Sequence, residues 1–492
     1  MACSKKSLST NREKGTSLLP VNVEAAKVAV PRKTDTIAAI ATPPGIGGIG
    51  IIRISGPDAL SILRRIFRPH RSNLKTYRSH RLYYGSAVNR DQEILDEILA
   101  VYMRAPATYT REDVVELHSH GSRLVLQSIL AEVFSAGARP AEPGEFTKRA
   151  FLAGRIDLTR AEAVIDLLQA KTTGGVRLAV GQLQGNLEAA LTPVQDVLVR
   201  LLAFVEVAID FPDDDVEILD RESLRHQLQG SVIAPVEELL RLAGQGKVIR
   251  EGVHVVIAGR PNVGKSSLLN GLLREERALV TDIPGTTRDT IEEMIAIHGV
   301  PVHLVDTAGI HAHEDLVEAL GIERARRKLH EADLVLFMID ARAGITRQDH
   351  ELYQLVRERD HLVVYNKIDL VDEEHLHGLE KMFPGAATVR LSALTGKGLE
   401  ELQEAIYAKV LHCGGQELEE QLPCAPNVRH KAILSAMLET CRRIDQALLA
   451  QIPADLLAVE LQTALDDLMD ITGVTTPEDV LEKIFSEFCI GK

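Results

Sequence analysis

The sequence contains no tryptophan, and aromatic residues make up only 4% of its 492 residues. It also lacks any apolar run of the roughly 18 residues that a membrane-spanning helix requires, so we expect a soluble, cytoplasmic chain with no membrane partner. The five cysteines show neither the paired spacing of a metal site nor a disulfide framework, which agrees with a reducing compartment. The chain also lacks an excess of basic residues, because 70 Asp and Glu outnumber 56 Lys and Arg and give a formal net charge of −14. This balance excludes a protein coated with nucleic acid and restricts any RNA contact to a local patch.

The length is sufficient for about three domains, each with its own hydrophobic core. Residues 1–33 carry scattered Lys and Arg among small polar residues, without sustained periodicity. This composition predicts a disordered extension. A mitochondrial presequence is the alternative, which the acidic residues Glu13 and Glu24 disfavour.

Residues 34–152 predict a compact α+β domain, because strand-like and helical patterns alternate along them. Strands are expected over residues 36–41, 49–54, 94–103 and 114–118, and helices over residues 59–67 and 124–136. The glycine-rich stretch between the first two strands is not followed by a helix, so it predicts a tight hairpin and not a dinucleotide-binding turn. The segment from Arg64 to Arg81 contains seven Arg or Lys and no acid, which predicts either a contact with RNA phosphates or a solvated loop.

Helical periodicity dominates residues 153–250 and returns in residues 413–492, on either side of a block with a different pattern. Helices are expected over residues 158–170, 183–208, 218–245, 428–451, 456–470 and 477–485. The simplest architecture is one helical domain built from both flanks, with residues 251–412 inserted in it. An acidic turn at residues 210–215 predicts a solvated break, with metal binding as the alternative.

The inserted block begins with a short apolar run, a glycine-bounded loop and a helical pattern. The spacing of Gly259, Gly264, Lys265 and Ser266 allows backbone N–H groups to wrap a polyphosphate at the positive end of that helix. In such a phosphate loop Lys265 reaches the β and γ phosphates, and the hydroxyl of Ser266 binds Mg²⁺. A structural glycine turn is the alternative, which the preceding strand and following helix disfavour.

Two further motifs indicate how phosphate and metal are contacted. A second apolar strand ends at Asp306, whose carboxylate can reach the Mg²⁺ shell, and Gly309 can offer its N–H to a γ-phosphate. Between the phosphate loop and this strand lies a hydroxyl-rich loop over residues 281–289 that can close over both metal and phosphate.

Two other motifs indicate that the base is guanine. Asn366, Lys367 and Asp369 follow an apolar strand, and an Asp carboxylate there accepts two hydrogen bonds from guanine, a donor pair that adenine lacks. Residues 392–394 follow another strand and fit a backbone contact to the guanine carbonyl. The motifs together predict a Ras-like α/β GTPase domain. The predicted GTP-binding residues are Asn262, Val263, Gly264, Lys265, Ser266, Ser267, Thr281, Asp282, Ile283, Pro284, Gly285, Thr286, Thr287, Asp306, Thr307, Ala308, Gly309, Asn366, Lys367, Asp369, Ser392, Ala393 and Leu394.

One expected residue is missing from this block. Ile310 stands where small signalling GTPases place a water-orienting Gln, so hydrolysis requires another residue to orient the water. A carboxylate in the following stretch is the natural candidate, and Glu318 is one such residue, with an ordinary solvated carboxylate as the alternative. Asn262, inside the phosphate loop, can help to bind a monovalent cation where other systems insert an arginine finger.

The chain ends in Phe488, Cys489, Ile490, Gly491 and Lys492. A lone Cys at this position is either a nucleophile or, as we expect, a small buried apolar side chain.

Several stretches together resemble one family. They are residues 35–45, residues 50–56, residues 143–151, the GTPase block with residues 281–289, and the tail of residues 488–492. On these motifs the chain from Asp35 to Lys492 resembles the tRNA-modification GTPases known as MnmE or TrmE. The first motif and the tail are specific to that family, whereas the GTPase motifs are shared with many others.

The resemblance implies a multidomain α/β and α fold: an α+β tetrahydrofolate-binding domain, a central helical domain and a Ras-like GTPase domain inserted in the helical domain. It also implies a homodimer formed through the N-terminal domain. With a flavoprotein partner, MnmG or GidA, the dimer would form a heterotetramer and act on tRNA. The reaction implied is a potassium-activated GTPase cycle coupled to formation of the 5-carboxymethylaminomethyl group on the wobble uridine.

The resemblance also implies roles for individual residues. A tetrahydrofolate derivative, in its 5-formyl or 5,10-methylene form, would be bound by Arg53, Glu116, Arg155 and Lys492, and some relatives carry Lys in place of this Arg155. Mg²⁺ would be bound by Ser266 and Thr287, and K⁺ by Asn262, Thr281, Ile283 and Thr286. Glu318 matches the catalytic acid that orients the water. Cys489 matches the tail cysteine of the family, and its chemical role stays open.

The alternative function belongs to another class: a ribosome-assembly or signalling GTPase that binds RNA and modifies nothing. Its GTPase block would look the same. The two differ at the N-terminal domain and the tail, because such a GTPase has no reason to keep a cationic folate pocket completed by Lys492.

Overall fold

The computed structural model of the chain describes residues 35–71, 76–210, 220–275, 292–306, 330–411 and 424–492. Several predictions therefore lie outside the described residues. They concern the extension of residues 1–33, the acidic turn, the loop of residues 281–289 with Thr281, Asp282, Ile283, Pro284, Gly285, Thr286 and Thr287, the motif residues Thr307, Ala308 and Gly309, and Glu318.

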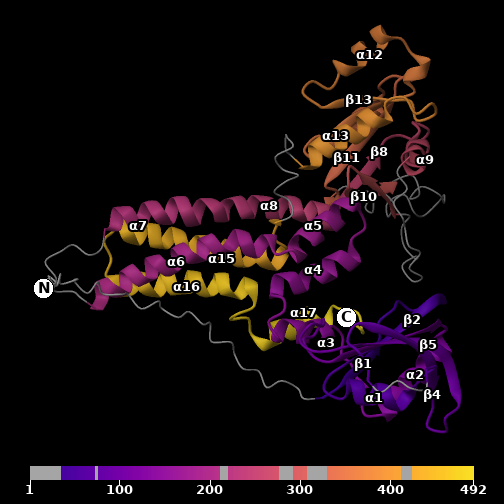
Figure 1. The fold of residues 1–492 in the computed structure, drawn as a ribbon. Helices are drawn as coiled ribbons and strands as arrows, with labels where there is room; N and C mark the ends of the chain where they lie inside the picture. Colours follow the sequence, from indigo (N-terminus) through magenta and orange to yellow (C-terminus); the bar gives the residue numbers. More distant parts are fainter. Residues whose placement is uncertain (1–34, 72–75, 211–219, 276–291, 307–329, 412–423) are drawn as a thin grey trace, which may run out of the picture. The chain divides into compact units, whose positions relative to one another are not determined.

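The N-terminal part contains a seven-stranded sheet of order β3-β4-β5-β6-β2-β1-β7. Its strands are β1 (Ile37–Ile40), β2 (Gly47–Ser55), β3 (Phe67–Pro69), β4 (Arg81–Val88), β5 (Ile94–Met103), β6 (Val114–Gly121) and β7 (Arg139–Pro140). Helices α1 (Ala59–Ile66) and α2 (Arg123–Ser135) pack against the sheet and share one hydrophobic core with it, and α3 (Glu145–Leu152) follows (Figure 1). This confirms the α+β prediction.

The glycine-rich stretch after β1 joins two antiparallel strands, so the predicted hairpin is confirmed. β1 pairs with β2 from Ile37 opposite Ser55 to Ile40 opposite Ile52. Gly50 in β2 is needed for helix packing, because a Cβ atom there would lie 2.5 Å from a methyl group of Leu126 in α2.

The basic segment from Arg64 to Arg81 is not one solvated loop, so that expectation is wrong as stated. It contains the end of α1, strand β3 and the first residue of β4. β4 was missed because its alternating pattern begins only after the cationic stretch. The arginines described in this segment are exposed, and their contact with RNA stays a prediction.

The helical part is formed by two sets of helices separated in the sequence. The first set is α4 (Leu158–Gln169), α5 (Thr173–Leu183), α6 (Asn186–Asp210), α7 (Arg221–Leu228), the π-helical turn η1 (Gln229–Ile233) and α8 (Ala234–Glu251). The second set is α15 (Val428–Leu449), α16 (Ala454–Thr472) and α17 (Glu478–Ser486). One hydrophobic core joins the two sets, since Leu198 and Leu201 pack in it together with Leu438 and Leu461 (Figure 1).

The structure adds helix α5, which the periodicity did not predict. Gly174 and Gly175 at its start weaken the helical pattern. The side chain of Thr172 compensates by accepting a hydrogen bond from the N–H of Gly175 as an N-cap.

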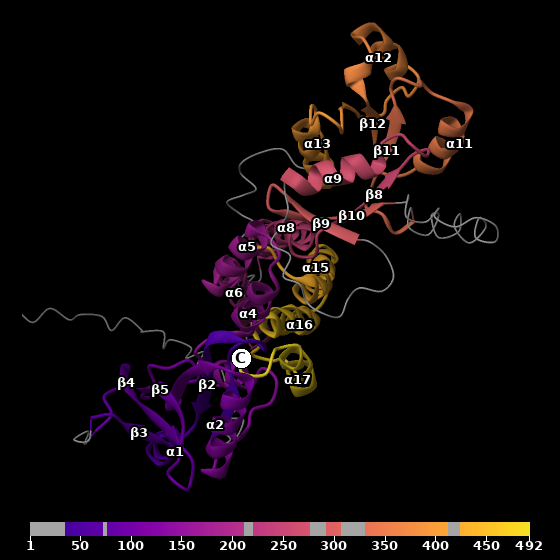
Figure 2. The same ribbon diagram turned by 90° about the vertical axis from the view of Figure 1, so that its right-hand side faces the viewer.

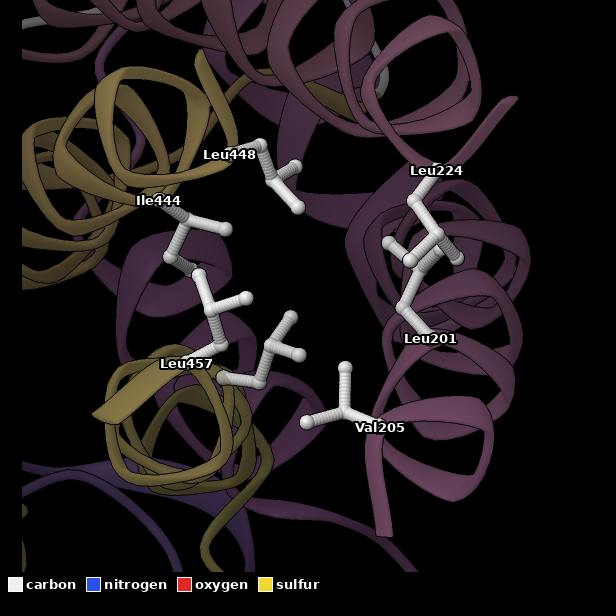
Figure 3. A pocket seen from close by; sticks show the side chains of 7 residues that line it. Leu201, Val205, Leu224, Ile444, Leu448 and Leu457 are labelled. Carbon is white, nitrogen blue, oxygen red and sulfur yellow. The ribbon is translucent and has the colours of Figure 1, made fainter. Parts of the chain in front are cut away.

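A small apolar pocket remains within the helical core. It is lined only by aliphatic side chains, and Figure 3 shows them pointing toward one another from α6, α7, α15 and α16. The lining residues are Leu201, Val205, Leu224, Ile444, Leu448, Leu457 and Leu461. With no polar atom to orient a ligand, the pocket is a packing feature of the bundle.

Residues 253–411 contain a six-stranded sheet of order β13-β12-β11-β8-β10-β9. Its strands are β8 (Val253–Ala258), β9 (Glu292–Ile297), β10 (Val300–Asp306), β11 (Leu334–Asp340), β12 (His361–Asn366) and β13 (Thr388–Arg390). All neighbouring pairs are parallel except β9 with β10. Helices α9 (Lys265–Glu275) and α13 (Leu399–Leu411) share a core with one face, and α11 (Arg347–Val356) and α12 (Glu373–Glu380) share a core with the other (Figure 2).

Among the residues that the structure describes, no helix is both long enough and apolar enough to cross a bilayer.

Candidate active site

The predicted nucleotide-binding motifs that the structure describes meet at one edge of the six-stranded sheet. Strands β8, β10, β11 and β12 run parallel and end at Ala258, Asp306, Asp340 and Asn366. Their carboxyl ends therefore lie along the same edge, which is where open α/β sheets bind their ligands.

The loop after β8 has the backbone conformation of a phosphate loop. Gly264 has φ +105°, and a Cβ atom there would lie 2.2 Å from the Nδ2 atom of Asn366, so only glycine fits. Asn262 also adopts a left-handed conformation, with φ +65°. Helix α9 begins directly at Lys265, so its free backbone N–H groups and positive dipole end are directed toward the loop.

Lys265 lies inside this loop. Its side chain is buried, and its ammonium group donates to the carbonyl oxygens of Gly259 (2.8 Å) and Arg260 (2.9 Å). The ammonium group is thus held where a bound polyphosphate would need a counter-charge. Ser266 and Ser267 are exposed in the first turn of α9.

Asn366 connects three segments of the site. Its Nδ2 atom donates to the carbonyl oxygen of Val263 at 2.7 Å, and its Oδ1 atom accepts from the N–H groups of Lys367 (2.8 Å) and Ala393 (2.9 Å). Since Asn366 is almost fully buried, its amide fixes the phosphate loop relative to the base-binding motifs.

Lys367 makes a second connection, through a residue that the sequence reasoning missed. Its ammonium group donates to the carbonyl oxygen of Asn262 (2.9 Å) and to Oδ2 of Asp340 (2.5 Å). Burial raises the pKa of the Asp340 carboxyl, but the hydrogen bonds from Lys367 and from the N–H of Ala343 outweigh it and hold the pKa below its usual value. The available signal was an acid at the end of an apolar strand, the same signal that identified Asp306.

The remaining base-binding residues are placed differently from one another. Asp369 lies exposed in a short 3₁₀ turn after Lys367. Ser392 is buried, and its hydroxyl oxygen accepts from the N–H of Thr395 at 3.3 Å, whereas Leu394 is 87% exposed. The carboxylate of Asp369 is therefore accessible to a base, and the loop of residues 392–394 is held by its own hydrogen bonds.

The residues expected to bind a folate also come together, in the N-terminal part. Arg53 in β2 stands opposite Glu116 in β6, and its Nε atom lies 2.9 Å from Oε1 of Glu116. Arg155 donates to the carbonyl oxygen of Tyr109 at 3.0 Å. The guanidinium carbons of Arg53 and Arg155 lie 5.9 Å and 4.7 Å from the centre of the Tyr109 ring. Tyr109, which the sequence reasoning missed, thus joins the two cations.

The carboxyl of Glu116 is ionised at neutral pH. The imidazole of His118, whose Nε2 atom lies 3.5 Å from Oε2 of Glu116, is the largest cause that lowers its pKa, burial acts in the opposite direction, and the charge of Arg53 lowers the pKa further. The cluster of Arg53, Glu116 and Arg155 therefore combines cationic groups with one carboxylate acceptor.

The C-terminal tail contacts this cluster. Arg53 Nη1 donates to the carbonyl oxygen of Gly491 at 3.4 Å, and a Cβ atom on Gly491 would lie 2.4 Å from the carbonyl oxygen of Ile40. The tail backbone is thus packed against the end of β1, and Lys492 follows it. Cys489 is exposed, so the expectation of a buried apolar cysteine is wrong: the neighbouring Phe488 fills the core position instead.

Comparison with known proteins identifies the family of the chain. Residues 158–489 match the family model of the MnmE helical domain, and residues 36–155 match that of the GTP-binding protein TrmE N-terminus. The chain is similar to the tRNA modification GTPase MnmE of Desulfotalea psychrophila, at 52% identity over 93% of this chain and 98% of that protein. The MnmE proteins of Aquifex aeolicus and Natranaerobius thermophilus are 47% and 43% identical, each over 93% of this chain and 100% and 99% of their own lengths. The chain belongs to the MnmE family of tRNA modification GTPases.

The MnmE-like motif of residues 143–151 has a structural task that the sequence did not reveal. Arg149 donates to Asp35 (2.9 Å) and Glu145 (3.0 Å), and Arg139 donates to the same two carboxylates. Burial raises the pKa of Glu145, but the hydrogen bond from Arg139 and further bonds from the Glu142 N–H and Arg149 lower it to about 2. This network holds α3, which carries Phe146 beside Arg53, against β1 and β7.

Proposed function

We propose that the chain is a potassium-activated GTPase that, with a flavoprotein partner of the MnmG or GidA kind, forms the 5-carboxymethylaminomethyl group on the wobble uridine of certain tRNAs. The observation that carries the proposal is the pair of sites in one MnmE-family chain. A phosphate loop is tied to guanine-recognition motifs by Asn366 and Lys367, and a separate cluster that contains Arg53 and Glu116 is contacted by the tail at Gly491. We place this reaction in the cytoplasm.

The domain division that we propose follows the elements. Residues 34–152 form the folate-binding and dimerisation domain, residues 153–250 and 413–492 form the helical domain, and residues 251–412 form the GTPase domain inserted in it. The shared helical core supports the insertion, because helices from both flanks pack in one cluster. The segments before and after the GTPase block also lie next to each other, which supports the insertion too. Arg250 at the end of α8 donates to the carbonyl oxygens of Ala425 (2.7 Å) and Pro426 (3.1 Å).

Arg53, Glu116, Arg155 and Lys492 are proposed to bind a tetrahydrofolate derivative. The residues fit the chemistry of that ligand, because guanidinium and ammonium groups suit the carboxylates of a folate and a carboxylate acceptor suits the donor edge of its pterin. The lowered pKa of Glu116 and the two cations near the Tyr109 ring support this fit. When bound, the folate would supply a one-carbon unit.

Arg53→Ala is expected to weaken binding of 5-formyltetrahydrofolate by about 10- to 100-fold, the value of one or two charge-assisted hydrogen bonds. GTP affinity should stay unchanged, because Arg53 is in a different domain from the phosphate loop. Isothermal titration with each ligand measures both. Arg65→Ala is the matched control, since Arg65 is an exposed arginine of the same domain. Wild-type folate affinity in Arg53→Ala would exclude the residue from the site.

Mg²⁺ is proposed to be bound by Ser266 and Thr287, and K⁺ by Asn262, Thr281, Ile283 and Thr286. The hydroxyl and carbonyl oxygens of these residues are suitable ligands for hard cations. Ser266 and Asn262 both lie at the phosphate loop and are exposed to solvent, which supports the proposal. A cation at Asn262 would supply the positive charge that an arginine finger supplies elsewhere.

The GTPase rate is expected to be higher in K⁺ than in Na⁺ at equal ionic strength, by about tenfold or more, since one missing electrostatic stabiliser costs that much or more in turnover. Phosphate release in the two salts measures it. Asn262→Gly tests the cation site directly, because glycine keeps the φ of +65° and removes only the amide. The GTPase rate of this variant should no longer be higher in K⁺ than in Na⁺. Equal rates of the wild-type chain in K⁺ and Na⁺ would contradict the cation assignment.

We propose a homodimer formed through the N-terminal domain, joined by the flavoprotein partner into a heterotetramer. An exposed apolar stripe supports it: Tyr84 in β4 stands opposite Leu99 in β5, and Leu82 and Ile49 are also exposed (49%, 39%, 53% and 66% exposed, respectively). Sedimentation velocity at micromolar concentration tests the proposal, and a monomer would contradict it.

The decisive test of the proposed function is mass analysis of the wobble nucleoside in cells that lack this chain. We expect the modified uridine to disappear and to return when the wild-type chain is supplied. The alternative, a ribosome-assembly or signalling GTPase, predicts unchanged nucleosides with altered ribosome profiles.

A further inference from the structure

Arg260, the second residue of the phosphate loop, has its side chain turned toward helix α11. Its Nε atom lies 2.8 Å from Oδ1 of Asp349, and its Nη2 atom donates to the carbonyl oxygen of Gly344 at 3.4 Å. The side chain of Arg260 is 17% exposed and that of Asp349 is fully buried. The ion pair therefore belongs to the interior of the GTPase domain.

Asp349 is itself held in a fixed position. Its Oδ2 atom accepts from the N–H and the hydroxyl of Thr346, both at 2.8 Å, in the capping box that begins α11. Both of its oxygens thus have partners, one from the helix cap and one from the phosphate loop. A rotation of this carboxylate would break the cap, so Asp349 is a rigid anchor for Arg260.

The backbone of Arg260 faces the opposite way, into the loop. Its carbonyl oxygen accepts from the ammonium group of Lys265 at 2.9 Å. The next carbonyl groups are held by the base-recognition motif, since Asn262 and Val263 accept from Lys367 and Asn366. Arg260 therefore links the group that contacts phosphate to α11, while Asn366 and Lys367 link the loop to the guanine side.

We propose that Arg260 is a positioning residue for nucleotide binding and hydrolysis: its ion pair with Asp349 fixes the loop backbone and thereby the ammonium group of Lys265. The inference rests on the proposed GTP site. Arg260 acts through the backbone and not as a direct phosphate ligand, because its guanidinium group is occupied by Asp349 and Gly344. Such an anchor raises affinity by removing the ordering cost of the loop, and it raises turnover because small displacements of catalytic groups are costly.

The test compares Arg260→Ala, Arg260→Lys, Asp349→Asn and the double variant R260A/D349N. Dissociation constants for fluorescent GDP and a non-hydrolysable GTP analogue, kcat, KM and the melting temperature are measured for each. We expect kcat/KM of Arg260→Ala to fall on the order of 10²-fold and kcat/KM of Asp349→Asn to fall as well. The kcat/KM of the double variant should be no lower than that of the more impaired single variant. Arg260→Lys should be intermediate, because it keeps the charge and loses the planar fork.

Arg347→Ala is the matched control. Arg347 lies on the same helix and pairs with Glu351, but its side chain is 92% exposed, so wild-type kinetics are expected. A direct phosphate contact by Arg260 predicts a different pattern, in which Asp349→Asn frees the guanidinium group and tightens nucleotide binding or leaves it unchanged.

Three results would overturn the proposal: wild-type nucleotide affinity and kcat/KM in Arg260→Ala, additive effects in the double variant, or tighter or unchanged nucleotide binding in Asp349→Asn. If Arg260→Ala only lowers the melting temperature and shows wild-type kinetics at a temperature where it is folded, the proposal is also overturned. A wild-type chain that binds no GTP would instead overturn the proposed function, so the two failures are distinguishable.

Discussion

Asp369→Asn is expected to lower the affinity for GTP by about 10²- to 10⁴-fold, the value of two charge-assisted hydrogen bonds. The carboxylate accepts from both the N1–H and the 2-amino group of guanine, whereas an amide offers one acceptor and one donor. That pattern matches xanthine, which has a carbonyl group in place of the 2-amino group. Affinity for xanthosine triphosphate should therefore appear in this variant. Competition binding with the two nucleotides measures the exchange.

Because Asp369 is exposed, this substitution should change nucleotide binding without changing stability. Its side chain fills no core position, so the variant should unfold at the wild-type temperature. Asp372→Asn is the matched control, because Asp372 is also an acid in this stretch but caps helix α12 by accepting from the N–H of His375. A variant Asp369→Asn that still prefers GTP would remove the residue from the base site.

Glu318→Ala is expected to leave nucleotide affinity nearly intact and to lower turnover by about 10²-fold or more, the usual contribution of a group that positions or deprotonates the attacking water. Glu318 is expected to orient the water because Ile310, the residue after Gly309, stands where small signalling GTPases have a water-orienting Gln. Single-turnover hydrolysis and equilibrium binding of a GTP analogue separate the two effects.

Glu314→Ala is the control for this prediction, since it removes a carboxylate from the same stretch of sequence. If both variants lose turnover equally, the contribution is general charge and not one positioned acid. If Glu318→Ala loses GTP binding, the residue is structural and the catalytic assignment fails.

Sequence patterns predicted much of the fold correctly where local signals were strong. The hairpin from β1 to β2 followed from glycines without a helix behind them, and the long helices α6, α15 and α16 followed from their apolar spacing. Strand β4 and helix α5 were missed for opposite reasons. β4 begins at the end of a cationic stretch, and α5 begins with Thr173, Gly174 and Gly175, residues that weaken a helical pattern.

The nucleotide site shows the same division. The sequence predicted Lys265, Asn366 and Asp369 because the chemistry of phosphate and guanine requires these residue types at this spacing. The ion pairs of Asp340 and Asp349 were not predicted, because each joins the acid to a residue that is distant in sequence: Asp340 lies 27 residues from Lys367, and Asp349 lies 89 residues from Arg260.

Local sequence patterns were therefore enough to identify the phosphate loop, the guanine motifs, the helical flanks and the family resemblance, because each depends on neighbouring residues or on ligand chemistry. The pairing of Arg53 with Glu116, the arrival of the tail at Gly491 and the anchoring of Arg260 were decided by the tertiary structure alone. These contacts depend on strand register and on the packing of distant segments, and no local pattern encodes either of them.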